Sequence, residues 1–308
     1  MKGVAARAAA PLVQEVADGV HAHLQLDGGW CLSNSGVIVF DGGAVVVDTA
    51  ATERRAKDLS RAVDALAPGP RRIVVNTHHH GDHVFGNSVF GDSAEVIAHE
   101  RAVAEIEETG LALTRLWPDV DWGDIRLVTP TTTFTDRLDL RLGDRVAELH
   151  YVGPAHTTND VVVWLPDERV LFTGDTVLSG CTPFILMGSV SGTLEALERL
   201  RGFDARVLVC GHGPVCGPEA IESTIEYTHW LRELAEKGRR RGRTPLETAF
   251  EAAPGPYADL IDPERIVGNL HRAYAELDGA EPGAPLDVLA AFEEMVEFNG
   301  GRLPTCLA

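Results

Sequence analysis

The chain has 308 residues, of which 44% are hydrophobic, and its formal net charge is −19. This length and apolar content allow a sizeable core and disfavour intrinsic disorder. The acidic balance argues against a protein that binds nucleic acids or anionic membrane surfaces, because both are bound through basic faces. No run approaches the roughly 18 apolar residues that a membrane-spanning helix needs. We therefore expect neither nucleic acid nor membrane as a partner.

Cysteine usage and the N-terminal segment bear on the compartment. The cysteines are Cys31, Cys181, Cys210, Cys216 and Cys306. They are odd in number and form no CxxC pair, so we expect no disulfide framework and a reducing environment. Residues 1–11 are interrupted by Arg7 and have no Leu-rich apolar core, so we expect no secretory signal. The prediction is a cytoplasmic protein.

The first half of the chain reads as strands followed by helices. Residues 12–50 predict a β meander, with a hairpin turn at Asp41-Gly42-Gly43. Residues 52–66 show helical periodicity, which ends at Pro68-Gly69-Pro70. The elements expected next are a buried strand at 72–76, a strand at 94–98, a helix at 100–108 and an irregular, lid-like loop at 110–130.

The second half repeats this order and then becomes helical. Its expected elements are strands at 138–142, 146–152, 161–165 and 170–173, a helix at 194–200 and a strand at 206–210. From Pro218 onward we expect a helix ending near Lys237, and others at 246–252, 263–277 and 286–298. The sequence therefore predicts an α/β unit at 1–217 and a helical extension, residues 218–308, that packs on it.

A histidine-rich loop follows the expected strand at 72–76. Residues 77–83 read Thr-His-His-His-Gly-Asp-His. His78 and His80 are two apart, so in an extended segment they point to the same side, whereas His79 points elsewhere. Loops at strand ends are a common place for metal ligands, because they free side chains from the alternation of the sheet.

The same loop offers a second pair of ligands. Gly81 lets the chain turn and present Asp82 and His83, which suits two adjacent metal ions better than one. Three later segments share a pattern, an apolar strand that ends in a glycine-containing loop with a metal-capable side chain. Those side chains are His156, Asp175 and His212. Nitrogen and carboxylate ligands suit zinc, and also iron or manganese.

This set of motifs resembles that of the metallo-β-lactamase superfamily. The matching elements are His78-x-His80-x-Asp82-His83, His156, Asp175 in Thr-Gly-Asp-Thr, and His212 in Gly-His-Gly. Their order and spacing match over about residues 12–216. The resemblance implies an α/β (α+β) fold, a four-layer αββα sandwich with metals between the sheets at one edge, here with a C-terminal helical extension.

The resemblance also implies a role for each of these side chains. It assigns His78, His80 and His156 to a first metal, Asp82, His83 and His212 to a second, and Asp175 to a bridge between them. We expect two divalent metal ions, Zn²⁺ first, with iron or manganese compatible. Asp82 could also orient a hydroxide or pass its proton to the leaving group. With an aspartate at position 175, the set of metal-binding side chains resembles that of the glyoxalase II and lactonase branches of this superfamily.

The leading functional prediction is a dinuclear metal hydrolase. It would cleave an ester, thioester, lactone or amide bond of a small molecule with a metal-bridging hydroxide. Two divalent ions, two aspartates and a hydroxide leave about one positive charge, which lowers the pKa of bound water and holds a carbonyl oxygen. Three alternatives stay open, a mononuclear iron enzyme similar to persulfide dioxygenases, a phosphodiesterase or nuclease, and a scaffold without chemistry.

Other residues receive more ordinary predictions. Asp48 is expected to hydrogen-bond near the metals rather than bind one. The histidines expected at the surface or in helix caps are His21, His23, His99, His150, His229 and His271. Loops around 28–34, 110–130 and 178–192 are expected to shape the pocket, with Trp30, Trp117 and Trp122 either lining it or packing in the core. Tyr227, Trp230 and Tyr274 are the residues considered for a contact in a homodimer.

Overall fold

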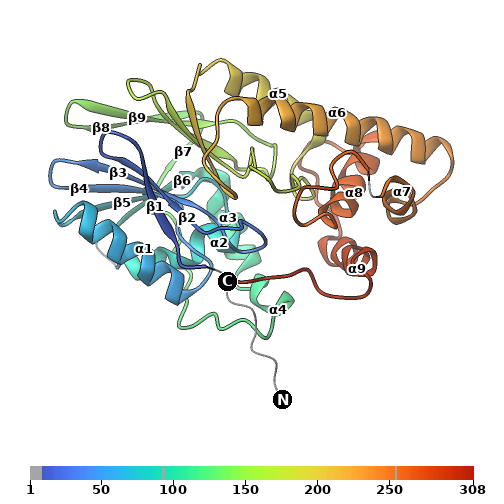
Figure 1. The fold of residues 1–308 in the computed structure, drawn as a ribbon, viewed down its shortest axis with the longest axis horizontal. Helices are drawn as coiled ribbons and strands as arrows, with labels where there is room; N and C mark the ends of the chain where they lie inside the picture. Colours follow the sequence, from blue (N-terminus) through green and yellow to red (C-terminus); the bar gives the residue numbers. More distant parts are fainter. Residues whose placement is uncertain (1–8, 92–93, 254) are drawn as a thin grey trace.

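Two β-sheets pack against each other in the computed structural model, which describes residues 9–91, 94–253 and 255–308 (Figure 1). The first sheet has the order β1-β2-β3-β4-β5-β6-β7, with β1 (Leu12–Ala17), β2 (Val20–Leu24), β3 (Ser35–Phe40), β4 (Gly43–Val47), β5 (Arg71–Val75), β6 (Glu95–His99) and β7 (Thr132–Phe134). The second has the order β12-β11-β10-β9-β8, with β8 (Arg137–Leu142), β9 (Arg145–Tyr151), β10 (Val161–Leu165), β11 (Val170–Gly174) and β12 (Val207–Cys210).

The alternation of side chains along the strands builds two apolar layers from one sheet. In β4, Val45 and Val47 join the core between the two sheets, while Ala44 and Val46 face the other way. Leu59 packs on that outer layer. Because successive strand residues point to opposite faces, an uninterrupted apolar run such as β4 belongs to a strand covered on both sides.

Helices cover both outer faces of the sheet pair. The helices are α1 (Glu53–Leu66), α2 (Gly81–Val84), the 3₁₀ helix η1 (Phe85–Phe90), α3 (Glu100–Thr109), α4 (Leu113–Leu116), α5 (Val190–Arg201), α6 (Glu219–Arg240), α7 (Pro245–Ala252), α8 (Arg265–Leu277) and α9 (Val288–Phe298). The helix α1 lies against the first sheet, and α5 and the start of α6 lie against the second (Figure 1). The expected αββα sandwich is confirmed.

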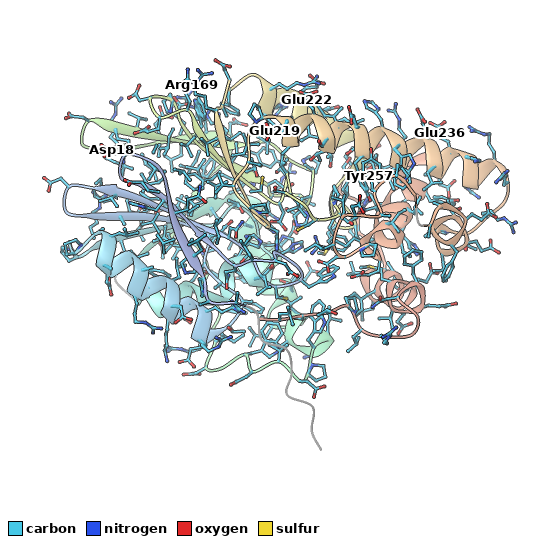
Figure 2. All side chains as sticks on the ribbon, viewed as in Figure 1. Asp18, Arg169, Glu219, Glu222, Glu236 and Tyr257 are labelled. Atoms are coloured by element: carbon cyan, nitrogen blue, oxygen red, sulfur yellow. The ribbon has the colours of Figure 1, made fainter. Side chains whose placement is uncertain are left out.

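The helix α6 joins the sandwich to the helices that follow it. Ile221 and Ile225, in its first half, pack on the second sheet, whereas Leu231 lies in a cluster formed with α7, α8 and α9. In the same half of α6, Glu219 and Glu222 are exposed to solvent (Figure 2). A division at residue 217 stays a prediction, because a single helix contributes to both parts.

The segment after α9 returns to the sandwich. The carbonyl oxygen of Leu307 accepts a hydrogen bond from Arg55 of α1 at 2.7 Å, and that of Pro304 accepts one from the Trp117 indole at 2.8 Å. Arg55 and Trp117 are both buried. These contacts tie the helical extension to the first sheet's side of the molecule.

The expected elements correspond closely to those observed, with several exceptions. The strand β7 and the short helices α2, η1 and α4 were not expected, although the rest of 110–130 is irregular as predicted.

All five cysteines are free thiols. None of the helices in the described residues is long and apolar enough to cross a membrane. Most of the segment considered for a secretory signal, residues 1–8, lies outside the described residues.

Some side chains predicted at the surface are buried. His23 is 2% exposed, so its surface prediction is wrong, whereas His99 accepts a hydrogen bond from the Arg101 backbone at the start of α3, as a cap does. Tyr227 and Tyr274 are buried and donate or accept hydrogen bonds inside the helical cluster. These two tyrosines therefore pack within the chain and are not available for a contact between subunits.

The burial of His23 predicts a specific pH dependence of stability. Burial lowers the pKa of His23 to about 4, although Asp58 opposes this. The unfolded chain then binds a proton between about pH 6.5 and 4 that the folded chain does not, so stability falls as the pH falls through this window. A His23→Gln variant should lose about 2 kcal/mol less than the wild type between pH 7 and pH 5, because one pKa unit is worth about 1.4 kcal/mol.

Urea unfolding at the two pH values measures this difference, and an NMR titration of the His23 ring checks its cause. Equal losses in both proteins, with a ring midpoint near the ordinary value of about 6.5, would contradict the prediction.

Candidate metal centre

The seven residues expected to bind metal lie together at one edge of the sandwich. They come from the loops that follow four strands, β5, β9, β11 and β12. The residues are His78, His80, Asp82, His83, His156, Asp175 and His212. Since β11 and β12 run parallel, their carboxyl ends meet at the same edge and bring Asp175 beside His212.

Within this set, the side chains form overlapping groups with ligand atoms no more than 4.8 Å apart. The groups are His78, His80 and His156; Asp82, His83 and His212; and His78, His83 and Asp175. The first two are the groups that the resemblance assigns to two separate metals. Whether each side chain binds an ion stays a prediction, but the geometry brings all seven together.

Asp175 lies between the two groups. Its Oδ1 is 3.3 Å from His83 Nε2, and its Oδ2 is 3.5 Å from His156 Nε2 and 3.4 Å from His212 Nε2. Two ligand atoms that are each about 2.1 Å from a tetrahedral zinc lie about 3.4 Å apart. The spacing of the carboxylate from both groups therefore suits a bridging ligand.

Several atoms of the centre have no hydrogen-bond partner. They are His78 Nε2, His80 Nε2, His83 Nε2 and Asp175 Oδ1, and all are buried. Buried polar atoms without a partner are uncommon, because each costs about 1–3 kcal/mol. Four such atoms gathered in one place, all of types that bind zinc, fit a site for divalent ions.

Hydrogen bonds from the other ring nitrogens hold three of the histidines. His83 Nδ1 is 2.9 Å from Asp48 Oδ2, and His212 Nδ1 is 3.0 Å from the Gly28 carbonyl oxygen. His156 Nδ1 contacts the Phe184 carbonyl oxygen. Each bond favours a proton on Nδ1 and so leaves Nε2 unprotonated in the neutral ring, the form that binds a metal.

Asp48 behaves as the sequence predicted. Besides His83, it accepts hydrogen bonds from the backbone and the hydroxyl of Thr77, each at 2.7 Å. Its own backbone has a φ of 59°, an uncommon conformation for a residue other than glycine. His79 also follows its prediction, since its Nδ1 lies 2.9 Å from Asn159 and 3.2 Å from Glu105 rather than in a ligand group.

Asp160 is a residue of the centre that the sequence did not reveal. Its carboxylate accepts hydrogen bonds from Ala155 N at 3.0 Å, from Thr157 N at 2.9 Å and from the Thr157 hydroxyl at 2.6 Å. These bonds hold the loop that presents His156. The only available signal was an acidic residue four positions after a candidate ligand, which is weak by itself.

Charge at the centre is compensated by the histidines themselves. Burial lowers the pKa of His212, but Asp175 and Asp82 outweigh it and raise the pKa to about 9. Burial also raises the pKa of Asp175, yet His212 and His83 hold it well below its usual range. A metal that binds here would replace protons on these rings, which is ordinary for metal sites.

A cavity of about 330 Å³ lies against the centre. Asp82 and Asp175 face it, together with three of the candidate histidines. The loops expected to shape the pocket all contribute, with Trp30 from 28–34, Leu113 and Leu116 from 110–130, and Phe184 from 178–192. Trp117 instead packs in the helical cluster, and Trp122 lies outside the cavity lining.

Comparison with known proteins places this geometry in a family. Residues 28–212 match the family model described as the metallo-beta-lactamase superfamily. A hydroxyacylglutathione hydrolase of Methylococcus capsulatus is 32% identical over 200 residues, which are 62% of this chain and 70% of that protein. A metallo-beta-lactamase structure from Pontibacter korlensis has a TM-score of 0.61 and 21% identity, covering 71% of this chain and 99% of that one, and shows the shared fold.

Other relatives are longer than this chain. The 2,4-dinitroanisole O-demethylase subunit alpha of a Nocardioides species is 28% identical over 65% of this chain and 55% of that protein. A linear primary-alkylsulfatase of a Pseudomonas species is 25% identical over 70% of this chain and 49% of that protein. The chain thus spans about half the length of these two relatives. From its motifs, its fold and the match over residues 28–212, the chain belongs to the metallo-beta-lactamase superfamily.

Proposed function

We propose that this chain is a metal-dependent hydrolase that uses two divalent ions to cleave an ester, thioester, lactone or amide bond of a small molecule. The observation that carries the proposal is the pair of three-residue ligand groups with Asp175 between them. The names of several relatives, hydroxyacylglutathione hydrolase, alkylsulfatase and beta-lactamase, are those of hydrolases and support the same class of reaction.

The ligand roles follow the two groups. His78, His80 and His156 would hold one ion, Asp82, His83 and His212 the other, and Asp175 would contact both. We propose zinc as the metal, because nitrogen and carboxylate ligands at this spacing suit it. Ions bound here would supply a hydroxide nucleophile near neutral pH and stabilise the negative charge that develops on the substrate oxygen.

Asp82 is the side chain best placed to handle a proton. It lines the cavity, its Oδ2 lies 3.3 Å from His212 Nε2, and its side chain is 12% exposed, against 7% for Asp175. A carboxylate in this position can accept a hydrogen bond from the nucleophile and orient it. It can then pass the proton to the leaving group, as general acid–base catalysis requires.

A single-iron enzyme is a weaker explanation of the same residues. It needs only one ligand group, and it would leave Asp82, His83 and His212 gathered and buried without a role.

The expected cytoplasmic location, which rests on the cysteines, stays a prediction.

Metal content and turnover test the proposal together. Protein purified without chelator should contain about two zinc ions per chain and hydrolyse a member of a panel of small esters, thioesters and lactones. His212→Ala should lose about one ion and at least about 100-fold in kcat/KM, because it removes a ligand of one of the two ions. His229→Ala, at an exposed position of α6, is the matched control. Full activity with well under one ion per chain would contradict the proposal, as would one iron per chain without hydrolysis.

Asp48 should influence metal affinity without touching the metal. Asp48→Asn keeps the shape of the side chain but removes the charge that accepts hydrogen bonds from Thr77 and holds the His83 ring. Loss of such a supporting contact typically lowers metal affinity about 10- to 100-fold. Competition with a chromophoric chelator measures the change, and Asp41→Asn in the exposed β3–β4 turn is the control. Unchanged affinity in Asp48→Asn would show that this hydrogen bond does not support the ligand.

A further inference from the structure

The walls of the cavity that face the metal centre are apolar. Leu113 and Leu116 come from α4, Phe184 and Met187 from the loop after β11, and Leu289 and Phe292 from α9. These six side chains come from three separate parts of the chain and converge on one space of about 330 Å³. This volume is at the lower end of the range for small-molecule sites, roughly 300–1,000 Å³.

The charge inside this space is confined to the centre and one arginine. Among the described residues that line the cavity, the acidic side chains are Asp82 and Asp175, and the one Lys or Arg is Arg265. Arg265 is 3% exposed, its Nη2 lies 2.8 Å from Asp262 Oδ2, and its guanidinium lies 4.3 Å from the Trp30 ring centroid. Its charge is therefore already balanced by Asp262, whose side chain is 11% exposed. Only its Nε lacks a hydrogen-bond partner. This N–H remains able to donate to a carboxylate at the far end of a substrate. A test must therefore distinguish apolar substrates from substrates that end in a carboxylate.

The apolar wall continues to the surface. Leu289 lines the cavity and is 67% exposed, so the apolar lining reaches the molecular surface at α9. Met187 adds a flexible and polarisable side chain, which adapts to groups of different shape. A substrate group that outgrows the cavity would leave it past Leu289.

We propose that the substrate carries an uncharged, apolar acyl or alkyl group of medium length on the bond to be cleaved. The inference rests on the proposed function, because it assumes that the cavity holds the substrate of the metal centre. The apolar group lies between α4, the loop after β11 and α9, and the scissile bond faces Asp82 and Asp175. A conjugate with several charges, such as a glutathione thioester, finds no unpaired cation to compensate it among the described lining residues.

The chain-length dependence of hydrolysis tests this inference. We would measure kcat/KM of the zinc-loaded full chain for 4-nitrophenyl esters and N-acetylcysteamine thioesters from acetyl to decanoyl. Each added methylene should raise kcat/KM about three- to fourfold until the cavity is full, as expected for the burial of apolar surface. Matched substrates that end in a carboxylate should be at least about tenfold slower, because an unpaired charge is costly to bury. A flat series, or a preference for the carboxylates, would overturn the inference.

Binding without turnover separates this inference from the proposed function. Titration calorimetry with methyl ketones of increasing chain length should show affinity rising with each methylene. If binding rises in this way but no substrate is hydrolysed, the apolar site stands and the hydrolase proposal falls. If esters are hydrolysed and neither series depends on length, the hydrolase stands and the apolar site falls.

A matched pair of variants locates the effect on α9. Leu289→Glu places a charge at the rim of the cavity and should lower kcat/KM for the decanoyl substrate at least about tenfold. Leu277→Glu introduces the same charge at the end of α8, where the leucine is 42% exposed and outside the cavity lining. The decanoyl-to-acetyl ratio should fall in the first variant and remain at the wild-type value in the second. Equal ratios in the two variants would overturn the assignment.

Discussion

The burial of charge at the edge of the sandwich is the constraint on which the rest of the site depends. The side chains of Asp82 and Asp175 are only 12% and 7% exposed and lie among five histidines, and isolated buried carboxylates would be costly. His83 and His212 compensate this negative charge. Burial lowers the pKa of both rings, but the nearby carboxylates outweigh burial and raise the pKa of each, so both rings hold a proton more tightly. Divalent ions would perform the same compensation more strongly. The centre is therefore arranged so that positive charge must be present, as protons or as metal.

Close packing of the loops makes this concentration of groups feasible, and glycine is required at particular points. A Cβ at Gly211 would lie 1.9 Å from Asp175 Oδ1, so no larger residue allows the His212 loop to approach the aspartate. Gly174 adopts a φ of 50°, and a Cβ there would lie 2.6 Å from the Thr77 hydroxyl. The glycines beside Asp175 and His212 thus let backbone segments from different strands come close together. A side chain at either glycine would fill the space between these segments.

The sequence predicted which side chains gather at this edge, because the candidate ligands stand in short segments that follow apolar strands. Three of the features that the sequence did not reveal have clear physical reasons. Asp160 acts through a loop that folds back on the carboxylate, and no periodicity encodes such a contact. His23 was expected at the surface or in a cap because histidine is seldom fully buried, but it lies near Asp58 and Arg55 of α1, on the face that this helix covers. The strand β7 has three residues, too few to show a pattern of alternation.

The wall of the cavity is encoded partly outside the segment that holds the candidate metal ligands. The family match spans residues 28–212 and includes every candidate ligand, but it ends before α8 and α9, which provide Arg265, Leu289 and Phe292. Hydrogen bonds from Arg55 and Trp117 to the segment after α9 attach this region to the sandwich. The segment that matches the family model therefore holds the candidate metal ligands, whereas the cavity wall that we propose to select the substrate is built partly outside it. A relative's name consequently says more about the reaction of this chain than about its substrate.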